Sequence, residues 1–429
     1  MPVPELDPFS LDVFVAVVAA VVFLTMRRPA LGAIALVLAG PFDFARSVGD
    51  TTVTLEKAAI VGLALGLVFR RSGWAVLRAR PVAAIALALA AVLAATALSI
   101  HAAEFRGPAV RETLKAAEYL FVFVLAAIAV AADPDETLLG GALAAIAIVV
   151  ALAAGADFLV GAHSAVLVGG RTVPRIAGPL EGPNQLAGWL GLLLPILFAR
   201  AIRGRDPLAI VAFVVAALAL ALTLSRAGIV AGLIGVGVVV VWSGAGARAT
   251  ALRLGALVAV VVAGAVAATG AGAHVFSAEQ VDTGNGLATR AQLWQAALAL
   301  WRTHPLLGIG AGNFELRLSD VGLLGVRTHA NDYYLQCLVE GGIPLLSAGL
   351  AATFAWLVAL ARGRSALVIG VFAAGIAFAL HQLVDDLAFY PKVGDLAWSL
   401  VGIAAALRVQ ASTRERSSAS IAASSTARV

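Results

Sequence analysis

The sequence predicts an all-α protein that crosses a membrane many times. Of its 429 residues, 61% are hydrophobic and 13% are charged, with a mean hydropathy of +0.97; a soluble domain carries roughly 25% charged residues. Long apolar runs alternate with short charged connectors. The period-2 pattern of barrel strands is absent and Ala and Leu dominate, which favours helices over strands.

The apolar runs define the expected helices in chain order. Because a helix needs about 20 residues to cross a hydrocarbon core about 30 Å thick, roughly 12 or 13 runs can span. The run at residues 30–44 is the weakest of them. The runs cover residues 11–26, 30–44, 55–69, 82–99, 114–132, 138–156, 185–201, 207–224, 227–242, 252–270, 333–361, 365–384 and 395–408.

Positive charges in the connectors predict the orientation. More than half of the 30 Lys and Arg residues lie in connectors that alternate along the chain with the others, so they share one side of the membrane. The positive-inside rule makes that side cytoplasmic, and the long polar segment at residues 271–332 then faces outward. The cationic connectors are residues 26–28, 70–80, 200–205, 247–253, 362–364 and the tail from Arg408 onward.

Composition divides the chain into three regions. Residues 1–170 are expected to form N-terminal transmembrane helices. Residues 171–410 contain the outer loop, 271–332, which has the apolar spacing of short amphipathic helices, and the ionisable residues that make this region the candidate for chemistry. Residues 411–429 are rich in Ser and Arg, which predicts a disordered cytoplasmic tail.

The outer loop is also where cationic and imidazole side chains gather. These residue types predict that the loop handles an anion, because guanidinium groups form strong charge-assisted hydrogen bonds to phosphate or carboxylate. The residues concerned are Arg290, Trp294, Arg302, His304, Arg317, Arg327 and His329.

Before the loop, two arginines lie beside predicted helix ends. Arg175 and Asn184 flank a Gly- and Pro-rich stretch, where broken backbone can present N–H groups to a ligand; the alternative is a helix start capped by Asn184. Arg226 follows Ser225 in a turn within an almost continuous apolar run. An arginine at membrane depth on the outer face indicates function, and the alternative is snorkelling to the interface.

Arg290 begins a predicted amphipathic helix that lies on the membrane surface and ends at the glycine-rich residues 308–312, with Trp294 one turn further along. An arginine in a first helical turn opposes the helix dipole. This mismatch is expected if Arg290 is kept to bind an anion, and a solvated arginine is the alternative.

His329 leads from the loop into a long apolar run, and Asn331, Asp332 and Glu340 follow it. Imidazole is suited to take a proton from a hydroxyl near neutral pH, which makes His329 a candidate general base; a surface histidine that caps a helix is the alternative. Further on, His381 and Asp385 are expected four residues apart on one helix face as a supporting pair.

Other kinds of site find no support in the sequence. The carboxylates of the loop are scattered, so no metal site is predicted. Cys337 is the only cysteine, which excludes a disulfide within the chain and a cysteine-based zinc site. No nucleic-acid motif is present. Two or three arginines facing outward at membrane depth, without a metal site or cofactor, suggest a lipid-linked diphosphate as substrate.

These ordered motifs resemble the O-antigen ligase and polymerase family of bacterial envelope polysaccharide enzymes. The resemblance covers roughly residues 170–405. It rests on Gly178 through Asn184-Gln-Leu-Ala187, the Leu-Thr-Leu-Ser225-Arg226 turn, Arg290 with Trp294, Pro305-Leu-Leu-Gly308-Ile-Gly310, His329 with Tyr334-Leu-Gln and Glu340-Gly, and His381 with Asp385.

The resemblance implies a GT-C-like fold and an inverting, metal-independent glycosyltransferase of the bacterial inner membrane. Such an enzyme moves a glycan from undecaprenyl diphosphate to the hydroxyl of a glycan or lipid-core acceptor on the outer face. It further implies that Arg226 and Arg290, with Arg175, hold the diphosphate and that His329 is the base. Many relatives have a second histidine or a glutamate two residues after the first, where this chain has Asn331.

Three alternatives stay open at this point. The same site would serve a polymerase that joins lipid-linked repeat units, because ligase and polymerase differ in the acceptor. A transporter would place ionisable residues near the bilayer midplane and show repeated halves, which the sequence does not. A non-catalytic assembly partner is the third alternative.

Overall fold

The computed structural model describes residues 11–42, 45–48, 51–70, 72–161, 164–168, 171–269 and 287–426, so residues 270–286 of the outer loop lie outside it. Within these ranges the protein is an all-α bundle, as the sequence predicts. The helices are α1 (Leu11–Arg27), α2 (Pro29–Ala39), α3 (Leu55–Val68), α4 (Arg80–Ser99), α5 (Arg106–Ala132), α6 (Glu136–Leu159), α7 (Pro183–Gly204), α8 (Pro207–Leu222), α9 (Arg226–Trp242), α10 (Ala245–Thr269), α12 (Leu287–Thr303), α13 (Tyr333–Leu360), α14 (Ala366–His381) and α15 (Pro391–Thr426).

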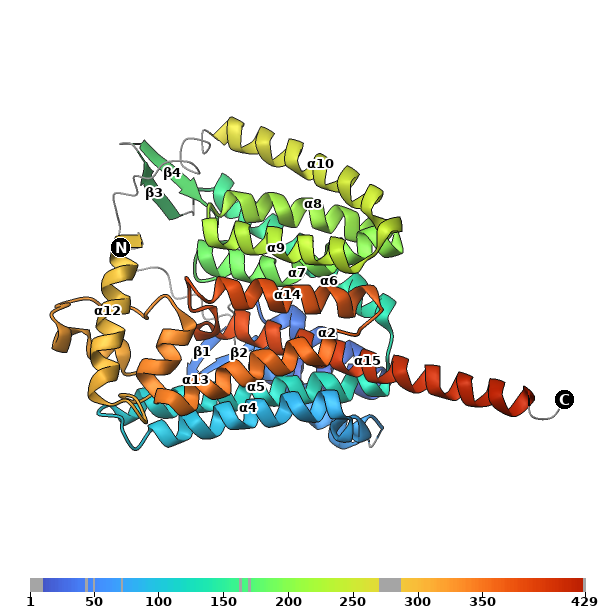
Figure 1. The fold of residues 1–429 in the computed structure, drawn as a ribbon, viewed down its shortest axis with the longest axis horizontal. Helices are drawn as coiled ribbons and strands as arrows, with labels where there is room; N and C mark the ends of the chain where they lie inside the picture. The colour runs from blue at the N-terminus through green and yellow to red at the C-terminus, as the bar shows by residue number, and fades with distance from the viewer. Residues whose placement is uncertain are drawn as a thin grey trace.

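The long helices run side by side, whereas α12 lies across one end of the bundle (Figure 1). We call the end with α12 the loop end. The C-terminal part of α15 projects from the opposite end, which we call the tail end. An arrangement in which α12 lies across the spanning helices is the one expected for a segment parallel to a membrane surface.

Six of the described helices are long and apolar enough to cross a membrane, namely α4, α5, α6, α7, α13 and residues Pro391–Ser418 of α15. Four more apolar helices, α2, α8, α9 and α14, are shorter, with 11 to 17 residues. The sequence predicts roughly 12 or 13 spans. The difference arises because several apolar runs form short helices: 17 residues of α9 reach about 25 Å, slightly less than the hydrocarbon core.

Two short β-hairpins flank the helices near the loop end, a feature that the sequence reasoning missed. Strand β1 (Ala45–Val48) pairs with β2 (Thr51–Thr54), and β3 (Ser164–Val168) pairs with β4 (Arg171–Arg175), both antiparallel. A signal for the second hairpin is present, because Ser-Ala-Val-Leu-Val and Arg-Thr-Val-Pro-Arg flank a Gly-Gly pair. Strand β4 ends at Arg175, so the second hairpin positions this residue at the site.

Helix α7 lies at the centre of the bundle and is buried along nearly its whole length. Trp189 and Phe198 on it are 0% and 1% exposed. Glycines let neighbouring helices approach it closely: a Cβ at Gly235 of α9 would lie 2.6 Å from Pro195 Cγ, and one at Gly370 of α14 would lie 2.4 Å from Ile196 Cα. Small residues at such contacts are typical of helix packing in membranes. This packing fixes the loop-end termini of α7, α9 and α14 relative to one another.

The tail differs from the sequence prediction. Helix α15 continues to Thr426, so residues 411–426 are helical rather than disordered. The described side chains of this extension are exposed, and it projects beyond the bundle (Figure 1). Ala, Arg and Glu within it favour a helix, whereas its many Ser and Thr residues are poorer helix formers.

Candidate active site

Arg175 is held at the end of β4 by two hydrogen bonds. Its Nε donates to the Thr223 carbonyl at 2.7 Å and its Nη2 donates to Asn184 Oδ1 at 3.0 Å. Asn184 is therefore a partner of an arginine and not the cap of α7, whose N-cap is Gly182. Burial and, to a smaller extent, the positive charge of Arg290 lower the pKa of Arg175 to about 10.

Arg226 is the first residue of α9, directly after a tight turn. Leu224 has φ +53°, Thr223 Oγ1 donates to the Leu220 carbonyl, and Ser225 Oγ accepts the Gly228 N–H as N-cap. The Arg226 side chain is exposed, and none of the described residues forms a hydrogen bond with it. The positive end of the helix dipole disfavours a cation at this helix start and favours an anion. The exposed guanidinium can therefore bind an anionic ligand here.

Helix α12 presents two donors without partners. Arg290 Nε and Trp294 Nε1 are buried and have no hydrogen-bond partner among the described residues. Residues four apart share a helix face, so both donors point the same way. The apolar side chains of α12 pack on protein, because Leu293, Ala297 and Leu300 lie in one buried cluster with Ile309, Phe314 and Val339. The sequence predicts instead a helix that lies on the membrane surface.

The charge of Arg290 acts on three other residues of the predicted site, Arg175, His329 and Asp385. It lowers the pKa of Arg175 and of His329. Burial lowers the pKa of Arg290 itself, and Arg226 adds to this effect. Burial raises the pKa of Asp385, while Arg290 opposes that rise. The structure therefore brings together predicted site residues from β4, α9, α12 and two loops.

Both ring nitrogens of His329 have partners. Nε2 lies 3.0 Å from the Tyr390 hydroxyl, and Nδ1 accepts the Asn331 N–H at 3.2 Å. Since Nδ1 accepts, the neutral ring carries its proton on Nε2 and donates it to Tyr390. Burial lowers the pKa of His329 to about 4, with contributions from Arg290 and Lys115. The imidazole is thus neutral at pH 7, as a base must be.

The residues after His329 shape the loop and the start of α13. Asn331 has φ +52° and its side chain donates to the His329 carbonyl. Asp332 is the N-cap of α13 and accepts the Leu335 N–H at 2.9 Å. Asn331 therefore orients the histidine, and Asp332 anchors the helix that follows.

His381 and Asp385 do not share a helix face, so that sequence prediction is wrong. Helix α14 ends at His381, and Asp385 lies in the following turn, where its Oδ1 accepts the Asp386 N–H. Both still face the site. His381 Nε2 and Asp385 Oδ2 are buried without a partner in the described chain, and a Cβ at Gly228 would lie 3.4 Å from His381 Cε1.

Glu340 holds the glycine-rich loop that follows α12. Its Oε1 accepts the Phe314 N–H at 3.1 Å, and its carbonyl accepts the Gly310 N–H. Gly308 and Gly310 have φ +66° and +95°, which a residue with a Cβ adopts poorly. Glu340 is therefore a supporting residue that fixes α12 against α13.

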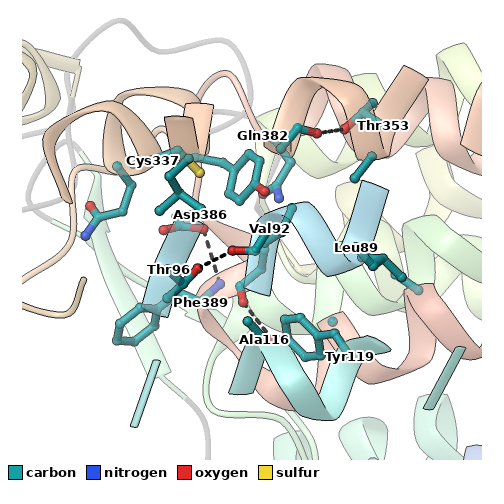
Figure 2. Close-up of a pocket in the computed structure, with 18 of the residues that line it drawn as sticks. Leu89, Val92, Thr96, Ala116, Tyr119, Cys337, Thr353, Gln382, Asp386 and Phe389 are labelled. Atoms are coloured by element: carbon teal, nitrogen blue, oxygen red, sulfur yellow. Dashed lines mark hydrogen bonds between the residues drawn. The ribbon is translucent and has the colours of Figure 1, made fainter. Parts of the chain in front are cut away.

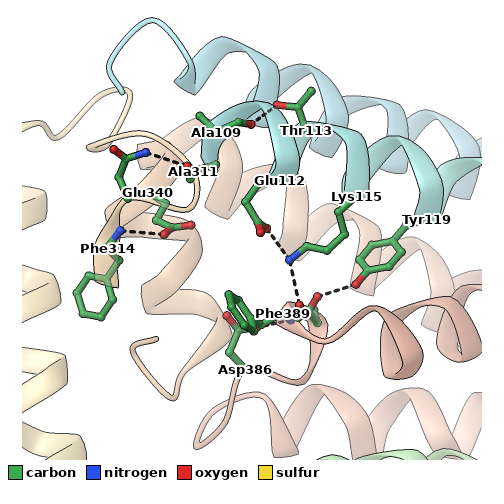
Figure 3. A network of polar contacts seen from close by, with 12 residues as sticks. Ala109, Glu112, Thr113, Lys115, Tyr119, Ala311, Phe314, Glu340, Asp386 and Phe389 are labelled. Atoms are coloured by element: carbon green, nitrogen blue, oxygen red, sulfur yellow. Dashed lines mark hydrogen bonds and ion pairs between the residues drawn. The ribbon is translucent and has the colours of Figure 1, made fainter. Parts of the chain in front are cut away.

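Three residues at the site were missed by the sequence reasoning. Tyr390 contacts His329, and Lys115 reaches from α5 to Glu112 at 2.6 Å and to the Phe389 carbonyl at 3.0 Å (Figure 3). Lys115 lies at the start of the predicted run 114–132, and a charge within a span is a signal for function; Glu112 lies just before that run. Nothing local in the sequence marks Tyr390.

Two hollows that share part of their lining lie near His329, which lines the smaller one. The vestibule holds about 480 Å³ and is lined by Pro108, Arg111, Glu112, Gly312, Glu315, His329, Gln336, Glu340 and Phe389. It shares Glu112, Gln336, Glu340 and Phe389 with a larger cavity of about 1080 Å³ that extends between α4, α5, α13, α14 and α15 (Figure 2). No group of three or more His, Cys, Asp or Glu side chains suited to a metal ion occurs in the described ranges.

One family model matches part of the chain. A family model described as O-antigen ligase matches residues 211–350, which include Arg226, Arg290 and His329. No relative among the curated proteins matches the chain. The matched segment and the spanning helices agree with a multi-pass protein of the bacterial inner membrane.

Proposed function

We propose that this membrane enzyme, which has an O-antigen ligase domain at residues 211–350, transfers a glycan from undecaprenyl diphosphate to an acceptor hydroxyl. The transfer inverts the anomeric carbon, needs no metal and takes place on the outer face of the membrane. The observation that supports it best is the convergence of Arg175, Arg226 and Arg290 beside a neutral, buried His329.

The arginines suit a diphosphate leaving group. Arg226 is exposed, and Arg290 Nε and Trp294 Nε1 lack partners among the described residues, so donors are present where an anion can bind. Cleavage of the bond between the anomeric carbon and the diphosphate oxygen leaves a negative charge on that oxygen. Preorganised guanidinium groups stabilise the charge as it develops, and electrostatic stabilisation of this kind makes the greatest contribution to the rate of many enzymatic reactions.

His329 would take the proton as the acceptor oxygen bonds to the anomeric carbon. Since both of its nitrogens have partners, the acceptor hydroxyl has to replace one of them. The Asn331 N–H at 3.2 Å is the longer contact, and the Tyr390 contact at 3.0 Å keeps the ring oriented. The low pKa keeps the base neutral, although it also makes the protonated ring a strong acid that must lose its proton after transfer.

The outward orientation follows from the distribution of cations among the connectors. It is tested by labelling single cysteines placed at exposed positions of α12 and of residues 319–327 in a Cys337→Ser background. Labelling by a membrane-impermeant reagent from the outside is expected. Labelling only after the membrane is opened would reverse the orientation and with it the proposed side of the reaction.

The activity itself is tested with purified protein, a lipid-diphosphate glycan donor and candidate acceptors in EDTA. Transfer in EDTA is expected, and a requirement for added divalent metal would contradict the mechanism. The acceptor that is used separates a ligase from a polymerase of the same family. A protein that inserts normally but shows no transfer with any pair would favour an assembly partner or a transporter instead.

A further inference from the structure

Four arginines line one hollow at the tail end of the protein, where α15 leaves the bundle (Figure 1). The hollow, which we call the tail pocket, lies between the turn from α5 to α6, the turn from α13 to α14, and α15. Its volume is about 990 Å³ including its open mouth. Two carboxylates also line it, which leaves the lining with a formal net charge of +2. The charged residues are Arg362, Arg364, Arg408, Arg414, Glu136 and Glu415.

The two carboxylates do not neutralise the arginines of the tail pocket. Glu136 Oε1 accepts a backbone N–H at the start of α14, at 3.0 Å. Glu415 Oε1 lies 3.7 Å from Arg364 Nη1, but the two side chains are 66% and 88% exposed, so this ion pair contributes little. The side chains of Arg362 and Arg414 form no hydrogen bond or ion pair within the ranges that the structure describes. The pocket therefore offers more guanidinium donors than its own acceptors use.

These arginines converge from separate parts of the chain. The positive-inside rule predicts arginines in the connectors at this end, but it does not predict that they share one hollow. Arg362 belongs to the turn after α13, whereas Arg408 lies on α15, and the two are close enough for their charges to act on each other. Arg408 Nη1 donates to the Val358 carbonyl over a long 3.4 Å, which leaves other donors of the guanidinium for a ligand. Cations that the fold holds together favour an anion between them, and a phosphate accepts hydrogen bonds from several guanidinium groups.

The tail pocket lies at the depth expected for lipid headgroups. Trp242 at the end of α9 is 46% exposed and donates to the Ala361 carbonyl at 3.2 Å, in the turn that carries two of the arginines. Tryptophan is enriched at the membrane–water interface. On α13, Phe354 and Val358 are 68% and 54% exposed and share one helix face. This apolar face borders the pocket, because Arg408 contacts the Val358 carbonyl.

We propose that the tail pocket binds the phosphate of an anionic phospholipid, whose acyl chains lie along the apolar face of α13 at Phe354 and Val358. This site is separate from the proposed glycan transfer, because it lies at the end of the bundle opposite to α12 (Figure 1). Basic pockets between transmembrane helices are suited to anionic headgroups. A soluble phosphate compound would suit the guanidinium groups equally, but it would leave the apolar face beside them unused.

Two photoreactive lipids test the site on the full-length protein in phosphatidylcholine nanodiscs. One is phosphatidylglycerol and the other is phosphatidylcholine, each with a diazirine in one acyl chain, and labelled peptides are identified by mass spectrometry. The anionic probe is expected to label α13 near Phe354 and Val358 about tenfold more than the zwitterionic probe does. Equal labelling of this face by the two probes would overturn the proposal.

Two double variants remove charge from the tail pocket. Arg362→Gln combined with Arg408→Gln, and Arg364→Gln combined with Arg414→Gln, should each reduce labelling by the phosphatidylglycerol probe about tenfold, because each pair removes two cations from the headgroup. Two independent pairs guard against a folding defect in one of them, and both should elute from size-exclusion chromatography as the parent does. Unchanged labelling in both would overturn the site.

The matched control removes two charges from other cationic connectors. Arg78 and Arg205 are exposed and do not line the tail pocket. Arg78→Gln combined with Arg205→Gln should therefore leave labelling near Phe354 and Val358 unchanged. A loss equal to that of the pocket variants would mean that the lipid responds to the total positive charge, and the pocket would not be a site.

Calorimetric titration with inorganic phosphate distinguishes a soluble ligand from a lipid. The protein in phosphatidylcholine nanodiscs is expected to bind inorganic phosphate weakly, because the free ion gains nothing from the apolar face of α13. Tight binding of inorganic phosphate that both pocket variants abolish, together with phosphatidylglycerol labelling that neither variant reduces, would assign the pocket to a soluble phosphate compound. The lipid assignment would then be wrong.

Discussion

The two sides of His329 differ in charge, in packing and in the origin of their residues. On the side of α7, α9 and α12, three guanidinium groups gather, and Arg290 and Trp294 keep donors without partners among the described residues. On the side of α5 and α13, carboxyl groups line a vestibule that continues into an apolar cavity. Glycosyl transfer breaks the bond between the anomeric carbon and a leaving group that gains negative charge, and it forms a bond to the oxygen of a neutral hydroxyl. The proposed function therefore fits the leaving group to the guanidinium groups and the hydroxyl to the vestibule.

The site is assembled from several segments of the chain. Arg226, Arg290 and His329 fall within the matched residues 211–350, but each side is completed from elsewhere. Arg175 comes from the hairpin before α7, and Tyr390 comes from the turn before α15. Variants on the two sides should therefore separate effects on the donor from effects on the acceptor.

The largest effect is expected from the residue that both sides share. His329→Ala should lower glycan transfer by roughly 10²–10⁴-fold, the usual contribution of a general base, while binding of the lipid-diphosphate donor is retained. The measurement is the initial transfer rate together with donor binding by the purified variant. His304→Ala, at an exposed position after α12, is the control and should be near normal. A His329→Ala enzyme within a few-fold of the parent would show that another group takes the proton.

The donor side is tested by the conservative exchange at Arg226. Arg226→Lys should be nearly as impaired as Arg226→Ala, with transfer reduced about 10²–10³-fold, because an ammonium cannot form the planar fork that binds a phosphate through two hydrogen bonds. The donor KM and kcat of both variants are compared. Arg302→Lys, an exposed arginine on α12, serves as the control. Near-normal transfer by Arg226→Lys would reject a bidentate clamp.

The parts of this site that the sequence predicts are those determined by local pattern. The apolar runs predict most helices, the dipole mismatch marks Arg290, and the break in an apolar run marks Arg226. What the sequence does not predict depends on packing between distant segments. Tyr390 lies 61 residues from His329, and its contact requires the turn after α14 to fold back on the loop. Asp385 leaves the helix face because α14 ends at His381, and periodicity does not reveal such an end.

Lys115 on α5 lowers the pKa of His329, the proposed base. The pKa of His329 is lowered to about 4 by burial, then by Arg290 and by Lys115. Activity requires the neutral ring, so the rate should be flat from roughly pH 5 to 8 and fall as the pH drops towards 4. Lys115→Met removes a positive charge and should raise this pKa, which moves the acid limb of kcat/KM upward by up to about one pH unit. A limb that does not move would mean that the titrating group is not His329.

The smallest effect is expected at the outer wall of the vestibule, where charge distinguishes the two sides most directly. Glu315→Gln keeps the size and a carbonyl acceptor but removes the negative charge, so hydrogen bonds from acceptor hydroxyls weaken without being lost. The KM for the acceptor should rise about three- to tenfold, in keeping with one hydrogen bond to a charged group, and the KM for the donor should not change. Asp320→Asn, an exposed carboxylate in η3 (Leu318–Val321) that does not line the vestibule, is the matched control. A rise in the donor KM with the acceptor KM unchanged would place the donor in the vestibule, and the assignment of one substrate to each side of His329 would be wrong.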